Sequence, residues 1–408
     1  MKKQIMSGML LFFSFLLISC KNSVSENKGT EGAAMMRPWY SETENGVLFY
    51  GNTDRIYSYD VQTGTVQPFC GKSGCRHDTE ACMSVGLAGE APLLTSYREN
   101  LYYININENA GNENIGELSL FCVDSKGEEK ELLEEVGGTD QAISSPVFFD
   151  GSMYLFQNDA EIKKDGTGIA GGKLSLCSVD LENGETEIIW TLEYKEDQMA
   201  VWCPEHTSDQ YLYYWSYVVD VKTGDVSEGG WHELDMETDE IKDLELEAFM
   251  RPTAWNGRRG IFCVSDLEIP MEGQESRENF YWLADLETGE VTKLEEFGRP
   301  GPGVWLKDGF LYIDWRRDMK TGAWKFYDWK EGTSSEIVTF EPREETMFYP
   351  EVCVERDGKE MLIGRGAPDG VKGHYLISVE DFLAGGTEYE LLCEVNAGNG
   401  NWAFQGSR

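Results

Sequence analysis

Basic residues and histidines are scarce in this chain of 408 residues. Its 35 lysines and arginines stand against 73 aspartates and glutamates, which gives a formal net charge of −38. A surface of that charge repels a polyanion, so we expect no nucleic-acid partner. Soluble extracellular surfaces carry such charge, and a bound cation or a basic protein partner would also suit it.

Catalytic motifs are lacking as well. Three of the four histidines, His206, His232 and His374, fall in separate parts of the chain, and no G-x-S-x-G nucleophile motif occurs. The string GTGIAG at residues 166–171 matches a dinucleotide-binding fingerprint as text, but no helical pattern follows it. Acidic residues are too numerous for a general acid and base to be chosen among them. The sequence therefore names no catalytic residue.

Long apolar runs are confined to the N-terminus, where one indicates export. Lys2 and Lys3 precede apolar residues 9–18, a run too short to span a bilayer comfortably. It ends in LISC, which resembles the lipobox of bacterial lipoproteins and implies cleavage before Cys20, diacylation of its thiol and anchoring at the extracytoplasmic face of the cell membrane. An ordinary cleaved signal with an incidental cysteine is the alternative. We expect a lipoprotein signal peptide at residues 1–19 and a flexible tether at residues 20–36, which are small and polar.

From residue 37 onward, one strand pattern repeats with a period of about fifty residues. Each repeat has a proline, a turn signal such as Asn-Gly or Asp-Gly, and further strands, the last two joined by an acidic turn. The phased prolines are Pro38, Pro92, Pro146, Pro204, Pro252, Pro302 and Pro350. This predicts an all-β fold at residues 37–408, a seven-bladed β-propeller of four-stranded antiparallel blades, with six or eight blades as alternatives. Because proline cannot donate to a strand ladder, we place these prolines on the edge strand of each blade.

The hairpin at residues 280–297 (FYWLADLETGEVTKLEEF) is the plainest copy of the repeat. Aromatic and β-branched residues favour strands on both sides of its turn. Asp285 can accept hydrogen bonds from the turn backbone, and Gly289 supplies a positive φ. We place this hairpin as the outer half of the fifth blade.

The connections between second and third strands vary most in length. We expect loops at residues 107–117, 158–172, 218–230 and 266–278, whereas the turns between third and fourth strands are short, as in DVQTG, DLENG and DLETG. Variable loops on a rigid scaffold usually carry binding sites. We therefore expect function on the face that bears these loops.

One stretch has the composition of a metal site. Cys70, Cys75, His77 and Cys82 lie in CGKSGCRHDTEAC, between the first and second blades. Three sulfur donors and one imidazole are a ligand set for tetrahedral zinc, and the glycines allow the chain to fold tightly. With all four positions filled by protein, the zinc or other soft metal would be structural.

The alternatives are a disulfide between two of these cysteines, or thiols that neither bind a metal nor form a disulfide. Of the 10 cysteines, six besides these three and Cys20 lie singly in apolar strands: Cys122, Cys177, Cys203, Cys263, Cys353 and Cys393. We expect these six to be buried small hydrophobes. An exported protein with so many separate thiols indicates a reducing habitat, which favours a metal over a disulfide.

Residues 37–408 resemble the propeller-type surface lipoproteins of Gram-positive bacteria, which are loosely related to TolB-like and quinoprotein-like propellers. The cluster at residues 70–82 and the repeated turn DLETGEVTKL carry this resemblance. The turn lacks the tryptophan that follows the glycine in the quinoprotein repeat, which argues against a quinone cofactor. The resemblance implies fold and location, and no particular ligand.

These observations favour a membrane-anchored binding module that holds a peptide, a glycan or a solute on the loop-bearing face. A protein-interaction scaffold in an envelope complex is the alternative, and a polysaccharide lyase or hydrolase is a third hypothesis. Paired carboxylates with raised pKa values would favour the enzyme, and a large exposed apolar patch would favour the scaffold. Apart from zinc or another soft metal, we expect no cofactor.

Overall fold

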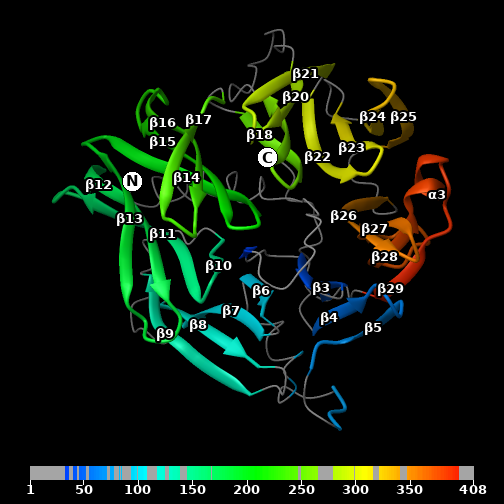
Figure 1. The fold of residues 1–408 in the computed structure, drawn as a ribbon, viewed down its shortest axis with the longest axis horizontal. Coiled ribbons are helices and arrows are strands. Elements are labelled where there is room, and N and C mark those ends of the chain that lie inside the picture. The colour runs from blue at the N-terminus through cyan, green and yellow to red at the C-terminus, as the bar shows by residue number, and fades with distance from the viewer. Residues whose placement is uncertain are drawn as a thin grey trace. The chain divides into compact units, whose positions relative to one another are not determined.

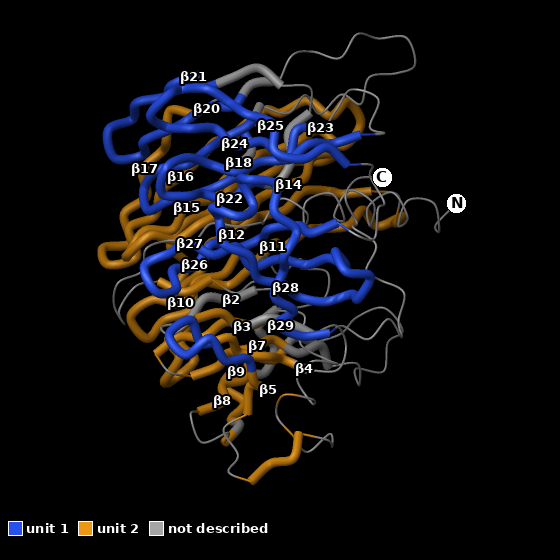
Figure 2. The backbone as a smooth tube through the Cα atoms, turned by 90° about the vertical axis from the view of Figure 1, so that its right-hand side faces the viewer, with its two compact units in different colours: residues 1–26, 60–66, 247–408 blue, residues 27–59, 67–246 orange. Residues whose placement is uncertain are grey.

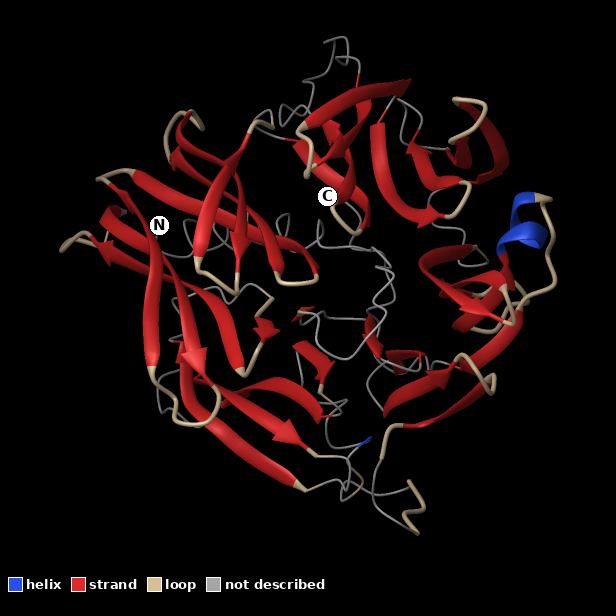
Figure 3. Cartoon of the chain, in the orientation of Figure 1, coloured by secondary structure: helices blue, strands red, loops and turns tan. Residues whose placement is uncertain are grey.

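The computed structural model is an all-β seven-bladed β-propeller of mainly four-stranded antiparallel blades, as predicted (Figure 1). Strands make up most of the described chain (Figure 3). The described residues are 33–35, 40–43, 46–51, 55–70, 74–77, 82, 84, 93–98, 100–107, 117–124, 128–137, 145–166, 168–246, 250–264, 279–297, 299–315, 321–340 and 347–394. The predicted signal peptide and Cys20 lie outside them. No helix within these ranges is long and apolar enough to cross a membrane.

The chain divides into two compact units, coloured separately in Figure 2. Unit 2 spans residues 27–59 and 67–246, and it holds most of the first four sheets. The first two sheets are β2 (Tyr40–Thr43), β3 (Gly46–Gly51), β4 (Arg55–Asp60) and β5 (Thr65–Pro68), then β6 (Leu93–Tyr97), β7 (Asn100–Asn107), β8 (Glu117–Val123) and β9 (Glu129–Gly137). The next two are β1 (Ala34–Met35) with β10 (Val147–Phe149), β11 (Ser152–Ile162), β12 (Ile169–Asp180) and β13 (Thr186–Tyr194), then β14 (Gln198–Ser208), β15 (Tyr211–Asp220), β16 (Val226–Asp235) and β17 (Glu240–Leu244).

Unit 1 spans residues 1–26, 60–66 and 247–408, and it holds the last three sheets. The strands are β18 (Met250–Asn256), β19 (Arg259–Val264), β20 (Asn279–Asp285) and β21 (Glu290–Phe297); β22 (Arg299–Leu306), β23 (Gly309–Trp315), β24 (Gly322–Asp328) and β25 (Thr333–Phe340); and β26 (Phe348–Arg356), β27 (Lys359–Gly366), β28 (Gly373–Ser378) and β29 (Glu390–Glu394). The hairpin chosen from the sequence is β20–β21, the outer half of the fifth blade, as expected.

One turn recurs at the end of several strands and explains the short connections. In each copy an aspartate Oδ1 accepts hydrogen bonds from the backbone N–H groups two and three residues later, as Asp285 does from Glu287 and Thr288. Gly289 then adopts φ 75°, and its N–H donates to the carbonyl oxygen of Asp285. The other copies begin at Asp60, Asp180, Asp220 and Asp328.

Two of the four expected loops are mostly strand, which corrects the prediction. The loop expected at residues 218–230 is reduced to residues 221–225, and the one expected at 158–172 to residues 163–168. Gly172 and Gly229 lie inside strands, where a side chain would collide with Tyr194 and with the backbone of Ser216. The strands on both sides of the loop at 107–117 end and begin as expected, β7 at Asn107 and β8 at Glu117. The loop expected at 266–278 lies outside the described residues.

Four of the phased prolines, Pro204, Pro252, Pro302 and Pro350, lie on the first, edge strand of their sheets, as predicted, and three of them mark β-bulges. Pro146 directly precedes β10, and Pro38 and Pro92 lie outside the described residues. Beside Pro204, Pro252 and Pro350, the first strand contains one residue more than its partner. The extra residues Glu205, Thr253 and Glu351 are all buried. A bulge leaves a residue outside the ladder, so a proline there costs no hydrogen bond.

The seventh blade contains a short helix that the sequence did not indicate. Helix α3 (Val379–Leu383) follows β28, and the Ser378 hydroxyl caps it by accepting from the Asp381 N–H. Phe382 of the helix is buried against Trp324 and Phe348. The helix thus covers an aromatic cluster of unit 1.

Candidate metal centre and hairpin-tip platform

All four residues of the predicted metal cluster come together. The ligand atoms of Cys70, Cys75, His77 and Cys82 lie within 4.8 Å of one another, and His77 Nδ1 is 3.3 Å from Cys82 Sγ. A tetrahedral zinc ion, with bonds of about 2.3 Å to sulfur and 2.0 Å to nitrogen, places neighbouring ligand atoms roughly 3.5–3.8 Å apart. The arrangement can bind a metal ion with small adjustments.

Backbone conformation produces this convergence. Gly74 has φ 74° and His77 has φ 57°, so the chain turns sharply on both sides of Cys75. Nothing lies near the position of a Gly74 side chain, so the requirement for glycine there is conformational. A left-handed histidine is uncommon, and here the conformation brings the imidazole to the cysteine sulfurs.

Both ends of the cluster are attached to one backbone carbonyl. The oxygen of Ile56 accepts from the Phe69 N–H at 2.8 Å and from the Ser84 hydroxyl at 2.7 Å. Ile56 is fully buried, and Phe69 and Cys70 pack against its hydrophobic cluster. The loop therefore starts and ends on the core of unit 2.

The cysteines of the chain fall into two groups. The nine described cysteines are thiols in this structure. Cys177, Cys203, Cys263 and Cys353 are buried, as predicted, whereas Cys122 and Cys393 are only half-buried. Burial raises the pKa of Cys177 to about 11 and that of Cys393 to about 12, which keeps these thiols protonated and unreactive.

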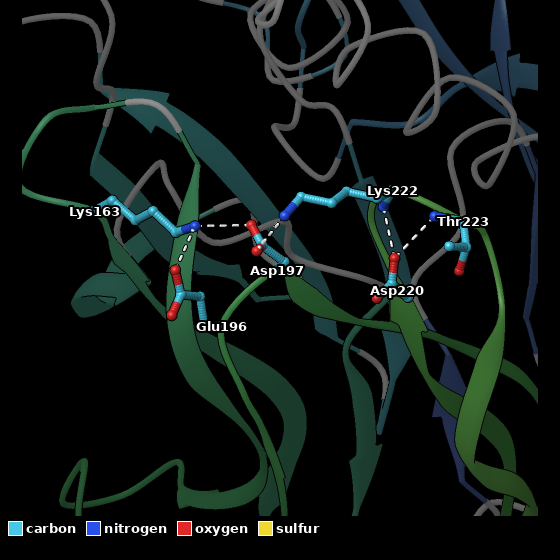
Figure 4. A network of polar contacts seen from close by, with 6 residues as sticks. All are labelled: Lys163, Glu196, Asp197, Asp220, Lys222 and Thr223. Carbon is cyan, nitrogen blue, oxygen red and sulfur yellow. Dashed lines mark hydrogen bonds and ion pairs between the residues drawn. The ribbon is translucent and has the colours of Figure 1, made fainter.

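A second feature lies at the tips of the long hairpins of the third and fourth sheets. Asp197 accepts from Lys163 Nζ at 2.8 Å and from Lys222 Nζ at 2.6 Å, and Glu196 also pairs with Lys163 at 2.7 Å (Figure 4). The lysines hold the pKa of Asp197 below its usual range, with Lys163 the larger cause. Asp220 holds the second tip through the backbone N–H groups of residues 222 and 223.

Exposed apolar side chains border this network. Ile162 and Val221, 59% and 54% exposed, directly precede the two lysines. The Val221 N–H donates to the carbonyl oxygen of Asp197 at 2.8 Å, which fixes the second tip to the connection between β13 and β14. We call Ile162, Lys163, Asp197, Val221 and Lys222 the hairpin-tip platform. Ile162, Lys163, Val221 and Lys222 lie on or next to second-to-third connections, where the sequence predicted function, and Asp197 lies on the connection between β13 and β14. The platform consists mainly of short turns instead of long loops.

Sequence reasoning missed a Ser–His–Asp arrangement in the fourth sheet. His232 Nδ1 lies 2.8 Å from Asp243 Oδ1, and His232 Nε2 lies 3.1 Å from Ser216 Oγ. The three residues lie on adjacent strands, so no local motif marks them. Ser216 is 0% exposed, and a hydroxyl that no substrate reaches cannot act as a nucleophile. We interpret the arrangement as a structural tie between β15, β16 and β17.

No protein-family model and no curated protein matches the chain. Solved structures with similarity include the tricorn protease (12% identity, TM-score 0.47, 91% of this chain and 36% of that one). Also similar is the β-propeller domain of the Trilobed protease from Pyrococcus furiosus (10% identity, TM-score 0.45, 90% of this chain and 98% of that one). TolB from Acinetobacter baumannii is similar too (13% identity, TM-score 0.34, 84% of this chain and 78% of that one). The chain thus spans only 36% of the tricorn protease. Likenesses this weak concern the fold alone, and the seven sheets described above form a seven-bladed β-propeller.

Proposed function

We propose that the chain is a lipid-anchored extracytoplasmic binding module in which a structural zinc ion holds the loop at residues 70–82. The hairpin-tip platform carries the binding part of this proposal, because it joins ordered ion pairs to exposed apolar side chains. The Cys3His cluster carries the zinc part. Lipid attachment at Cys20 rests on the lipobox in the sequence.

The geometry of the cluster supports zinc over an open catalytic metal. Four protein donors complete a tetrahedron and leave no position for water or substrate. Elemental analysis of protein purified under reducing conditions tests the site. We expect about one equivalent of zinc, and less than roughly a tenth of an equivalent of zinc or another soft metal would exclude it.

Lipid attachment is tested on the mature N-terminus. After expression in a bacterial host, mass spectrometry of the N-terminal peptide should show a diacylglyceryl group on Cys20. A Cys20→Ala variant should lose this mass and partition into the soluble fraction. A wild-type N-terminus without the lipid would contradict the proposal.

The platform supports binding of a peptide, a glycan or a solute. Its ion pairs order the two hairpin tips, so little conformational freedom is lost when a ligand binds. Ile162 and Val221 supply apolar contact area, and the flanking lysines and carboxylates supply polar contacts. Among these ligands, the exposed apolar side chains favour a segment of another protein. A protein-interaction scaffold is therefore the second candidate function.

The binding test uses defined probes and matched variants. A phage-displayed peptide library and a glycan array are screened with the wild-type protein and with the double variant Ile162→Asp/Val221→Asp. Ile188→Asp is the control, because Ile188 is also exposed (55%) but lies on β13, away from the tips. We expect probes that bind wild type and the control but not the double variant. Absence of any ligand, or equal binding by the double variant, would contradict the proposal.

A further inference from the structure

The N-terminal strand β1 occupies a slot formed by other strands of unit 2. It pairs antiparallel with β10, with Ala34 opposite Phe148 and Met35 opposite Val147, and it also contacts β6 and β14. It is the fifth strand of the third sheet, whereas each of the other sheets ends on its own first strand. The residues that form β1 belong to the segment expected to be a flexible tether. Three blades therefore surround a short extended piece of the same chain.

The main chain of this piece is held without any demand on its sequence. The Ala33 N–H donates to the carbonyl oxygen of Asp209 at 2.8 Å, and the Thr207 hydroxyl donates to the carbonyl oxygen of Ala33 at 3.4 Å. On the other side, β10 supplies a strand ladder. Main-chain bonds of this kind are the usual means by which a sheet edge binds a peptide as an added strand.

The side chains, by contrast, fit defined pockets. Ala33 and Met35, 4% and 6% exposed, are buried in the cluster between the third and fourth sheets, which includes Trp202. Ala34 packs against the cluster between the second and third sheets, as strand alternation requires. The slot thus accepts two small residues followed by an unbranched apolar residue.

We propose that this slot is a peptide-binding site for an extended segment with the pattern small-small-apolar, and that residues 33–35 of the chain are an exchangeable occupant. The slot is separate from the hairpin-tip platform and extends the proposed function to a second site. A partner segment of the same pattern competes with the chain's own strand. Covalent attachment gives that strand an effective concentration in the millimolar range, so the site opens only when the segment is displaced, weakened or cut.

The first test separates the occupant from the chain after folding. A protease recognition sequence is inserted after Met36 in the full chain, and a fluorescent peptide with the sequence GTEGAAMM of residues 29–36 is the probe. After cleavage, fluorescence anisotropy and native mass spectrometry should show saturable uptake of the peptide. The uncut chain should bind it at least about tenfold more weakly, because its own segment competes.

Peptide variants test the pocket for residue 35. A peptide with Met35→Asp should bind about tenfold to a hundredfold more weakly, because it places a carboxylate where an apolar side chain is buried. A peptide with Glu31→Gln should bind like the parent. Absence of exchange, equal binding of the Met35→Asp peptide, or equal uptake by the uncut chain would each overturn the proposal.

A second variant avoids the insertion. In the uncut full chain, Met35→Asp weakens the resident strand, so this variant should bind the parent peptide at least about tenfold more tightly than wild type does. Equal binding would overturn the proposal. Neither test depends on the hairpin tips. If the slot bound no peptide but ligand binding still required Ile162 and Val221, the further inference would fail and the proposed function would remain.

Discussion

The Nδ1 atom of His77 lies 3.3 Å from the Sγ atom of Cys82, close enough for one metal ion to bridge the two atoms. If zinc bridges them, a strong chelator under reducing conditions should lower the midpoint of thermal unfolding by at least about 5 °C, since the loop loses its metal bonds. Differential scanning calorimetry measures the shift. Cys82→Ser should show the lower midpoint without chelator and respond little to it. Cys122→Ser, outside the cluster, should respond like wild type, and a wild-type midpoint indifferent to chelator would argue against structural zinc.

His232 should make the fold sensitive to mild acid. Burial lowers the pKa of His232 below 6.5, and the carboxylate of Asp243 offsets this only in part. Below about pH 6.5, His232 therefore binds a proton more readily in the unfolded chain than in the folded chain. The free energy of unfolding is highest above this pH and decreases as the pH falls. Urea unfolding at pH 8 and pH 5.5 should show a smaller decrease in unfolding free energy for His232→Gln than for wild type.

Asp243→Asn provides the control for the sign of this effect. Without the carboxylate, the pKa of His232 should fall further, and the acid-induced loss of stability should increase. A decrease identical in wild type and His232→Gln would show that other groups dominate the acid response.

The repeated aspartate turn should contribute to stability through two hydrogen bonds. Asp180 Oδ1 accepts from the backbone N–H groups of Glu182 and Asn183 at 2.8 and 3.0 Å. Asp180→Ala should lower the unfolding free energy by about 1–2 kcal/mol, because both donors lose their acceptor. Glu182→Ala, on an exposed side chain of the same turn, should change it by less than about 0.5 kcal/mol. Equal effects in urea denaturation would refute the role of the carboxylate.

A buried ion pair joins β26 and β27 in the seventh blade. Arg365 Nε and Nη2 donate to Oε1 of Glu351 at 2.9 and 2.5 Å, and the Glu351 side chain is only 4% exposed. Arg365→Met should lower the unfolding free energy by about 3–5 kcal/mol, because it leaves a buried carboxylate without its guanidinium.

A double variant separates the pair from packing at the same position. Glu351→Met/Arg365→Met removes both charges and should recover much of the loss. Guanidinium denaturation of the single and double variants provides the comparison. If the double variant were less stable than Arg365→Met, the burial cost of the carboxylate would not explain the loss.

The repeating scaffold could be predicted because its signals are local. Alternating aromatic residues around Asp285 and Gly289 indicated a hairpin, and β20 and β21 form it. The prolines indicated edge strands because proline cannot donate, but the bulges depend on strand register, which the sequence does not show. The loop expected at 218–230 was too long, because Gly229 lies in a strand where the close approach of the neighbouring backbone depends on pairing.

The sequence by itself determined the seven-fold repeat, its turns and the four ligand residues of the candidate metal centre, because each is specified by neighbours along the chain. Only the tertiary structure decided that Ser216, His232 and Asp243 meet, that Lys163 and Lys222 share Asp197, and that β1 joins the third sheet. Those contacts join residues on different strands. Pairing register and packing bring such residues together, and neither leaves a mark in a short stretch of sequence.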